Sequence, residues 1–127
     1  MILLDSSGWL EFLTDGPRAA AFRARLEQAE AVLVPTVVIY EVYKISRREA
    51  DEHEANLAIT RLRQYRVEPL TDRLALEAAD FSLAHRLPMA DAIVYATARA
   101  HDATLVTGDG HFEGLPGVEY LPAGDAT

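Results

Sequence analysis

The 127-residue sequence contains no cysteine. This absence excludes a disulfide framework, a thiolate zinc site and a cysteine nucleophile. The sequence also has no apolar run long enough to span a membrane. Its first residues have no basic stretch of the kind that opens a signal peptide. We therefore expect a cytoplasmic protein that makes no membrane contact.

Positive charge is scarce as well, with 12 Lys and Arg against 20 Asp and Glu, for a formal net charge of −8. This balance argues against a general affinity for polyanions, because the summed field repels phosphate. Half of the cations nevertheless lie in one short segment: Lys44, Arg47, Arg48, Arg61, Arg63 and Arg66. This enrichment fits a phosphodiester substrate that docks beside an acidic pocket. A solvated helical hairpin with Arg–Glu pairs accounts for the same charges equally well.

The remaining composition, half hydrophobic and a quarter charged, is that of an ordinary globular protein. At this length we expect one domain over residues 1–127 that buries about two-thirds of its unfolded surface. Short apolar runs alternate with helical patterns, which indicates βαβ units and a parallel sheet covered on both faces. The predicted fold is therefore α/β, a three-layer α/β/α sandwich with a central, mostly parallel sheet of four to five strands.

Short apolar runs and helical periodicity place the elements along the chain. The predicted strands are residues 2–4, 31–34, 66–70, 104–106 and 118–121. The predicted helices are a segment that includes Trp9 and Phe12, residues 18–29, 37–50, 52–65 and 72–86, and a helix opened by Pro88. Thr36 and Thr71 are the expected N-caps of two of these helices. We expect the tail, residues 122–127, to be frayed.

Four acidic residues occupy related positions in this scheme. Asp5 and Asp109 each follow a predicted strand, and open α/β sheets bind their ligands at the carboxyl ends of the strands. Asp91 falls in the first turn of the helix opened by Pro88, near the positive end of its dipole. Glu41 lies about one turn inside the helix that follows the second strand. A carboxylate among apolar neighbours there needs a partner.

Each acid also has a purely structural explanation. Asp5 fits a helix cap, Asp91 complements a helix dipole, and Asp109 before Gly110 fits a turn. Taken together, four carboxylates that converge on one edge would repel each other unless a cation lies among them. Oxygen ligands without cysteine suit Mg²⁺ or Mn²⁺. Such an ion lowers the pKa of a bound water and stabilises charge on a phosphoryl group.

The four histidines show no spacing typical of a zinc site. We expect solvent-facing or structural roles for them, with His111, which is near the predicted pocket, as the exception. The four histidines are His53, His85, His101 and His111.

The order of the acids resembles that of the PIN-domain ribonucleases, and the length is similar to the VapC-type toxins of toxin–antitoxin pairs. The matching motifs are Asp5-Ser6 after the first strand, Glu41 in the helix after the second, Asp91-Ala92 at a helix start and Thr107-x-Asp109 after a strand. The match covers essentially the whole chain. The resemblance implies a compact α/β/α domain that cleaves RNA with Mg²⁺ or Mn²⁺. It further implies a homodimer, inhibited by a cognate antitoxin protein whose tail enters the active-site groove.

The same resemblance assigns roles residue by residue. It implies that Asp5, Glu41, Asp91 and Asp109 are the catalytic, metal-binding acids. Ser6 and Thr107 become polar supports whose hydroxyls contact a carboxylate or a metal-bound water. The resemblance does not identify which RNA is cut, because variable surface residues set the choice of substrate.

Three other readings fit less well. An aspartyl-phosphate phosphatase would carry a second Asp where this chain has Ser7. A response-regulator receiver would need a lysine after a late strand, and the only lysine is Lys44. A non-catalytic PIN-fold module that binds RNA or protein would keep the architecture without the acids. The four acids therefore favour the metal-dependent nuclease.

Overall fold

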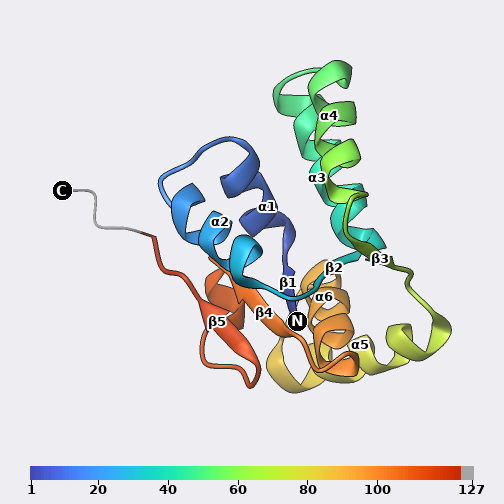
Figure 1. The fold of residues 1–127 in the computed structure, drawn as a ribbon. Coiled ribbons are helices and arrows are strands. Elements are labelled where there is room, and N and C mark those ends of the chain that lie inside the picture. The colour runs from blue at the N-terminus through green and yellow to red at the C-terminus, as the bar shows by residue number, and fades with distance from the viewer. Residues whose placement is uncertain (124–127) are drawn as a thin grey trace.

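The computed structural model describes residues 1–123. Five strands form one sheet in the order β3-β2-β1-β4-β5, and every neighbouring pair is parallel (Figure 1). The strands are β1 (Ile2–Leu4), β2 (Val32–Pro35), β3 (Arg66–Glu68), β4 (Thr104–Thr107) and β5 (Val118–Tyr120). The predicted α/β fold with a parallel central sheet is confirmed.

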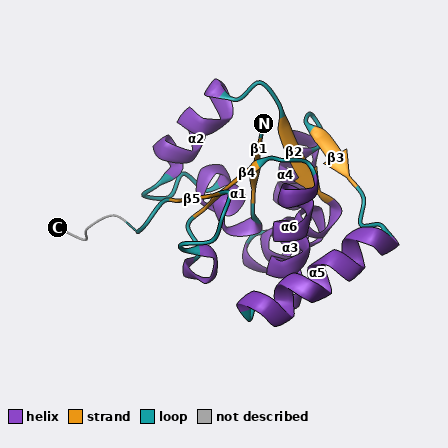
Figure 2. Cartoon of the chain, turned by 90° about the horizontal axis from the view of Figure 1, so that it is seen from below, coloured by secondary structure: helices purple, strands orange, loops and turns teal. Residues whose placement is uncertain are grey.

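Helices connect the strands and cover both faces of the sheet. They are α1 (Ser6–Leu13), α2 (Ala19–Gln28), α3 (Thr36–Glu49), α4 (Glu52–Leu62), α5 (Asp72–His85), α6 (Met89–Ala100) and the short 3₁₀ helix η1 (Gly110–Phe112). Seen from below, α2 lies on one side of the sheet, and α5 and α6 lie on the other (Figure 2). Within residues 1–123, no helix combines the length and the apolar character needed to cross a membrane.

The central strands are continuous apolar runs because helices cover both faces of the sheet. Leu3, Leu4, Val34 and Leu105 are all fully buried. In a parallel sheet enclosed in this way, successive side chains on both faces enter the core, so the sequence reads as a continuous apolar run rather than an alternating one. Short strands with this pattern are therefore recognisable from the sequence.

Two local expectations have different outcomes. Thr71 caps α5 as predicted, because its side chain accepts a hydrogen bond from the backbone N–H of Leu74. The prediction that Thr36 caps α3 is wrong, since Pro35 occupies the cap position and Thr36 is the first helical residue. The Thr36 hydroxyl instead accepts the backbone N–H of Leu70 at 3.3 Å, which ties the start of α3 to the segment after β3. Most of the tail expected to fray, residues 124–127, lies outside the described residues.

The order of the strands changes direction at β1 and β4. From β1 the chain first moves outward to β2 and β3, and it then returns to the other side of β1 to form β4 and β5. Ligands of open α/β sheets bind where the connections diverge in this way, here between β1 and β4. Leu4 pairs with Val106, so Asp5, which follows β1, and Thr107, the last residue of β4, lie at the same level.

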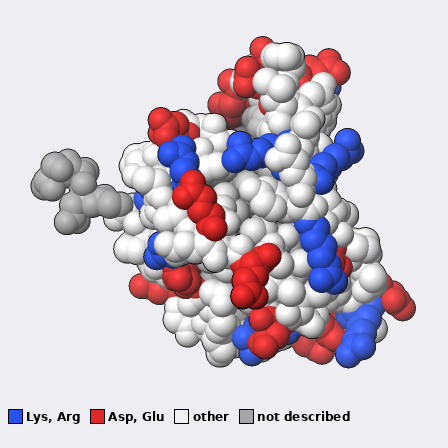
Figure 3. Space-filling view, viewed as in Figure 1, with Lys and Arg blue, Asp and Glu red and all other residues white. Residues whose placement is uncertain are grey.

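Most of the basic segment belongs to the helical hairpin of α3 and α4, which projects from the rest of the molecule (Figure 1), whereas Arg66 begins β3. Acidic side chains gather at its far end and basic ones nearer its base (Figure 3). Two of the basic residues form ion pairs with acids, Arg48 with Glu49 and Arg66 with Glu68. Arg–Glu pairing therefore accounts for part of this charge. The exposed cations that remain are Lys44, Arg47, Arg61 and Arg63.

Candidate metal centre

Asp5 is the buried anchor of the site, with only 3% of its surface exposed. Its Oδ1 accepts the backbone N–H of Gly8 at 3.0 Å, and its Oδ2 accepts the hydroxyls of Ser7 at 2.8 Å and Thr107 at 2.9 Å. A side chain at residue 8 would crowd this contact, since a Cβ there would lie 3.2 Å from Asp5 Oδ1. Three hydrogen bonds thus fix the carboxylate and leave part of Oδ1 free, because a carboxylate offers about four acceptor positions.

Burial raises the pKa of Asp5 above its ordinary value, and the charge of Asp109 raises it further. The hydrogen bonds from Ser7, Gly8 and Thr107 act in the opposite direction. The hydroxyl that reaches Asp5 from the start of α1 belongs to Ser7 and not to Ser6, the residue that the motif implied. Ser6 itself is half-buried.

Thr107 links the two strand ends. Its side chain is fully buried, and its hydroxyl donates to Asp5 Oδ2 and accepts the backbone N–H of Asp109, with both contacts at 2.9 Å. One hydroxyl therefore connects acids that are 104 positions apart in the sequence. A hydroxyl can do this because it carries both a donor and an acceptor.

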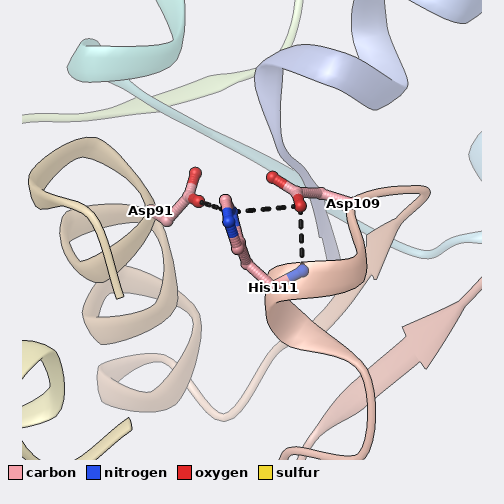
Figure 4. A group of neighbouring side chains, drawn as sticks. All are labelled: Asp91, Asp109 and His111. Atoms are coloured by element: carbon pink, nitrogen blue, oxygen red, sulfur yellow. Dashed lines mark hydrogen bonds and ion pairs between the residues drawn. The ribbon is translucent and has the colours of Figure 1, made fainter. Parts of the chain in front are cut away.

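Asp91, Asp109 and His111 form the exposed side of the site (Figure 4). One ligand atom from each lies within 4.8 Å of the other two, which is close enough for all three to hold one metal ion. His111 Nδ1 lies 3.0 Å from Asp91 Oδ2 and 3.2 Å from Asp109 Oδ1. The backbone N–H of His111 also donates to Asp109 Oδ1 at 2.9 Å. The three residues come from α6, the loop after β4, and η1.

The charges of this group perturb one another. Burial, followed by the charge of Asp109, raises the pKa of Asp91 to about 6, and Asp5 contributes in the same direction. The hydrogen bond with Asp91 and the charge of Asp109 raise the pKa of His111. The site therefore places several carboxylates close together, with the imidazole of His111 beside two of them. A cation would stabilise this arrangement of negative charge.

The fourth predicted acid, Glu41, lies half-buried on α3. The cluster within 4.8 Å, sought among residues 1–123, includes neither Glu41 nor Asp5. The role of Glu41 at the metal site stays a prediction. The structural explanations of two other acids also hold, because Asp5 caps α1 and Asp109 caps η1. Capping occupies only some of their acceptor positions, so it leaves oxygens free for a metal.

Arg18, which the sequence did not single out, holds the loop after β4 in place. Its Nη1 donates to the carbonyl oxygens of Gly108 at 3.3 Å and Leu121 at 3.0 Å. Its Nε pairs with Glu11 at 3.2 Å. Gly108 and Leu121 are 90 and 103 residues away from Arg18 in the sequence, so no local pattern could reveal these two contacts. Arg18 is a positioning residue for the loop that carries Asp109.

Comparisons with known proteins agree with this architecture. The sequence model of the PIN domain family matches residues 2–118, whereas no curated protein matches the chain. Similar solved structures include a toxin–antitoxin complex from Klebsiella pneumoniae, with a TM-score of 0.80 and 22% identity over 97% of this chain and 100% of that one. Another is VapC20 of Mycobacterium tuberculosis, described as a sarcin–ricin loop cleaving toxin, with a TM-score of 0.77 and 21% identity over 97% and 98% of the two chains. VapBC2 from Rickettsia felis, bound to a DNA fragment from its promoter, has a TM-score of 0.73 and 16% identity over 94% and 98%.

Proposed function

The chain belongs to the PIN domain family, and from that premise we propose that it is a metal-dependent endoribonuclease, the toxin of a toxin–antitoxin pair. One observation carries the proposal: Asp91 and Asp109 offer carboxylate oxygens within 4.8 Å of each other, beside the Thr107 hydroxyl that joins Asp5 to the Asp109 backbone. Acids whose pKa is raised, as for Asp5 and Asp91, and which lie at the ligand-binding edge of an α/β sheet are candidates for a functional site.

The donor set fits Mg²⁺ or Mn²⁺. Asp91 and Asp109 provide carboxylate oxygens within 4.8 Å of each other. Asp5 keeps a free acceptor position on Oδ1, which accepts one hydrogen bond, while Oδ2 accepts two. Small divalent ions are usually held by a few carboxylates together with several waters. When bound, the ion would activate a water and offset the charge that develops on the scissile phosphate.

The residues around the ion position these oxygens. Asp5 is immobilised by its three hydrogen bonds, so it needs little reorganisation when a cation binds. Thr107 sets the distance between Asp5 and the Asp109 backbone. We assign Glu41 as a further ligand, since its long side chain extends from α3 after β2, the strand beside β1. We keep Ser6 as a second polar support next to Ser7.

We propose RNA as the substrate, and the VapC20 likeness supports this choice because that protein is described as cleaving an RNA loop. The chain has a net negative charge, so phosphate contacts must come from local cations. We expect these contacts from the exposed cations of α3 and of the segment around α4 that are outside the two Arg–Glu pairs, namely Lys44, Arg47, Arg61 and Arg63.

We propose a cognate antitoxin protein as the physiological partner, because several similar structures are toxin–antitoxin complexes. An apolar groove of about 550 Å³ between α1 and the α3–α4 hairpin supports such an interaction. Leu10, Leu13, Ile45 and Leu57 line it, and Leu57 is 53% exposed. A partner segment with apolar side chains would bury this surface.

We also propose a homodimer. Leu76 and Leu83 on α5 are 70% and 84% exposed, and Met89 at the start of α6 is 78% exposed. Leu76 and Leu83 are seven residues apart and therefore share one helix face. A second copy of the chain would cover this face.

The test is cleavage of total bacterial RNA by purified protein, with cut ends mapped by sequencing. Cleavage in Mn²⁺ or Mg²⁺ should disappear in EDTA and in Asp109→Asn, while circular dichroism shows a folded protein. Asp102→Asn is the matched control, because Asp102 is exposed and lies in a turn where its positive φ also suits Asn. Cleavage that survives EDTA or Asp109→Asn would overturn the proposed mechanism.

A further inference from the structure

His111 is a side chain without an assigned role in the proposed reaction, although it faces the centre of the site. Its ring is 57% exposed, so packing in the core does not explain its position. Its Nδ1 nevertheless points between two carboxylates that come from different elements (Figure 4). Its backbone N–H donates to Asp109, which holds the residue next to that acid.

The distances are those of neighbouring ligands around one ion. In an octahedral site with bonds of about 2.1 Å, adjacent ligand atoms lie about 3.0 Å apart. His111 Nδ1 lies 3.0 Å from Asp91 Oδ2 and 3.2 Å from Asp109 Oδ1. An ion could therefore take the place of the shared hydrogen while the three side chains stay close to their present positions.

We propose that His111 is a nitrogen ligand of the metal, beside Asp91 and Asp109, and that the site therefore prefers Mn²⁺ to Mg²⁺. This inference rests on the proposed metal-dependent function. Mg²⁺ takes oxygen ligands almost exclusively, whereas an imidazole nitrogen favours divalent transition metals. Oxygen ligands alone would let the site bind whichever of the two ions is more abundant. One nitrogen ligand among the carboxylates shifts this selectivity toward Mn²⁺.

The experiment measures ion binding without RNA. Calorimetry gives the affinities of wild type, His111→Ala and His53→Ala for Mn²⁺ and Mg²⁺, and pulsed electron paramagnetic resonance detects nitrogen bound to Mn²⁺. His53 is an exposed histidine on α4 and serves as the matched control. We expect His111→Ala to weaken Mn²⁺ binding by at least about tenfold and Mg²⁺ binding by less than about threefold. The nitrogen signal should be present in wild type and His53→Ala and lost in His111→Ala.

Three outcomes would overturn the inference. Unchanged Mn²⁺ affinity would make His111 a surface residue. Tighter Mn²⁺ binding would mean that the imidazole occupies the place of the ion. Equal losses for both ions, without a nitrogen signal in wild type, would leave His111 with a positioning role only. RNA cleavage by a wild type that lacks the nitrogen signal would overturn this inference alone, whereas the signal without any cleavage would overturn only the proposed function.

Discussion

Removing the charge of Asp91 should stabilise the protein when no metal is bound. A pKa that rises from 3.8 to about 6 on folding would correspond to about 3 kcal/mol of unfolding free energy for a fully buried group. Asp91 is only half-buried, so screening by solvent reduces this contribution to about 1–2 kcal/mol. Because the folded-state pKa is raised, this contribution is fully present below pH 3.8 and is lost as the pH rises through about 6. Above pH 7 the wild type therefore bears the whole cost of an ionised Asp91, which Asp91→Asn avoids.

The assay is thermal unfolding of wild type and Asp91→Asn in EDTA between pH 4 and 8. The difference in unfolding free energy should be small at pH 4 and should favour the variant by about 1–2 kcal/mol at pH 8. For a domain of this size, that difference corresponds to a shift in melting temperature of about 5 °C. Comparing the two proteins cancels the titration of carboxylates elsewhere in the chain.

Excess Mn²⁺ should reverse this order. An ion at a hundred times its dissociation constant stabilises the wild type by about 2.7 kcal/mol. This gain exceeds the screened advantage of the variant, about 1–2 kcal/mol, and the variant should lose most of the gain. A variant less stable than wild type in EDTA at pH 8 would refute the argument. So would a wild-type melting temperature that does not respond to Mn²⁺, because the acids would then not share one site.

Three further substitutions test the supports of the site. Thr107→Val removes the hydroxyl shared by Asp5 and the Asp109 N–H and should cost about 1–3 kcal/mol of unfolding free energy in denaturant titrations, whereas Thr107→Ser, which keeps the hydroxyl, should cost much less. Gly108→Ala places a methyl group against the Arg18 guanidinium and should cost about 1 kcal/mol of unfolding free energy. If the losses of unfolding free energy from Gly108→Ala and Arg18→Ala were fully additive in the double mutant, the two residues would not be in contact. Glu41→Gln should weaken Mn²⁺ binding in calorimetry, and an unchanged affinity would remove Glu41 from the ligand set.

The sequence predicted those features that depend on local pattern. Asp5 and Asp109 could be placed at strand ends because apolar runs stop there, and Asp91 at a helix start because of Pro88. The contacts of these acids depend on which strands are neighbours, and the sequence alone does not give the strand order. Which serine hydroxyl donates to Asp5 depends on the phase of α1 relative to its cap, and a difference of one residue makes Ser7 the donor. His111 reaches Asp91 only because η1 turns its ring toward α6.

The central place of β1 has a consequence for the synthesis of the protein. β1 is translated before β2 and β4, the two strands with which it pairs, and the bond between Thr107 and Asp5 joins residues 102 positions apart. Contacts between such distant residues cannot form until the intervening chain has emerged. A nascent or truncated chain that ends before β4 would carry Asp5 and Asp91 without Asp109. The group formed by Asp91, Asp109 and His111 would therefore be complete only after β4 and the loop that follows it have been translated.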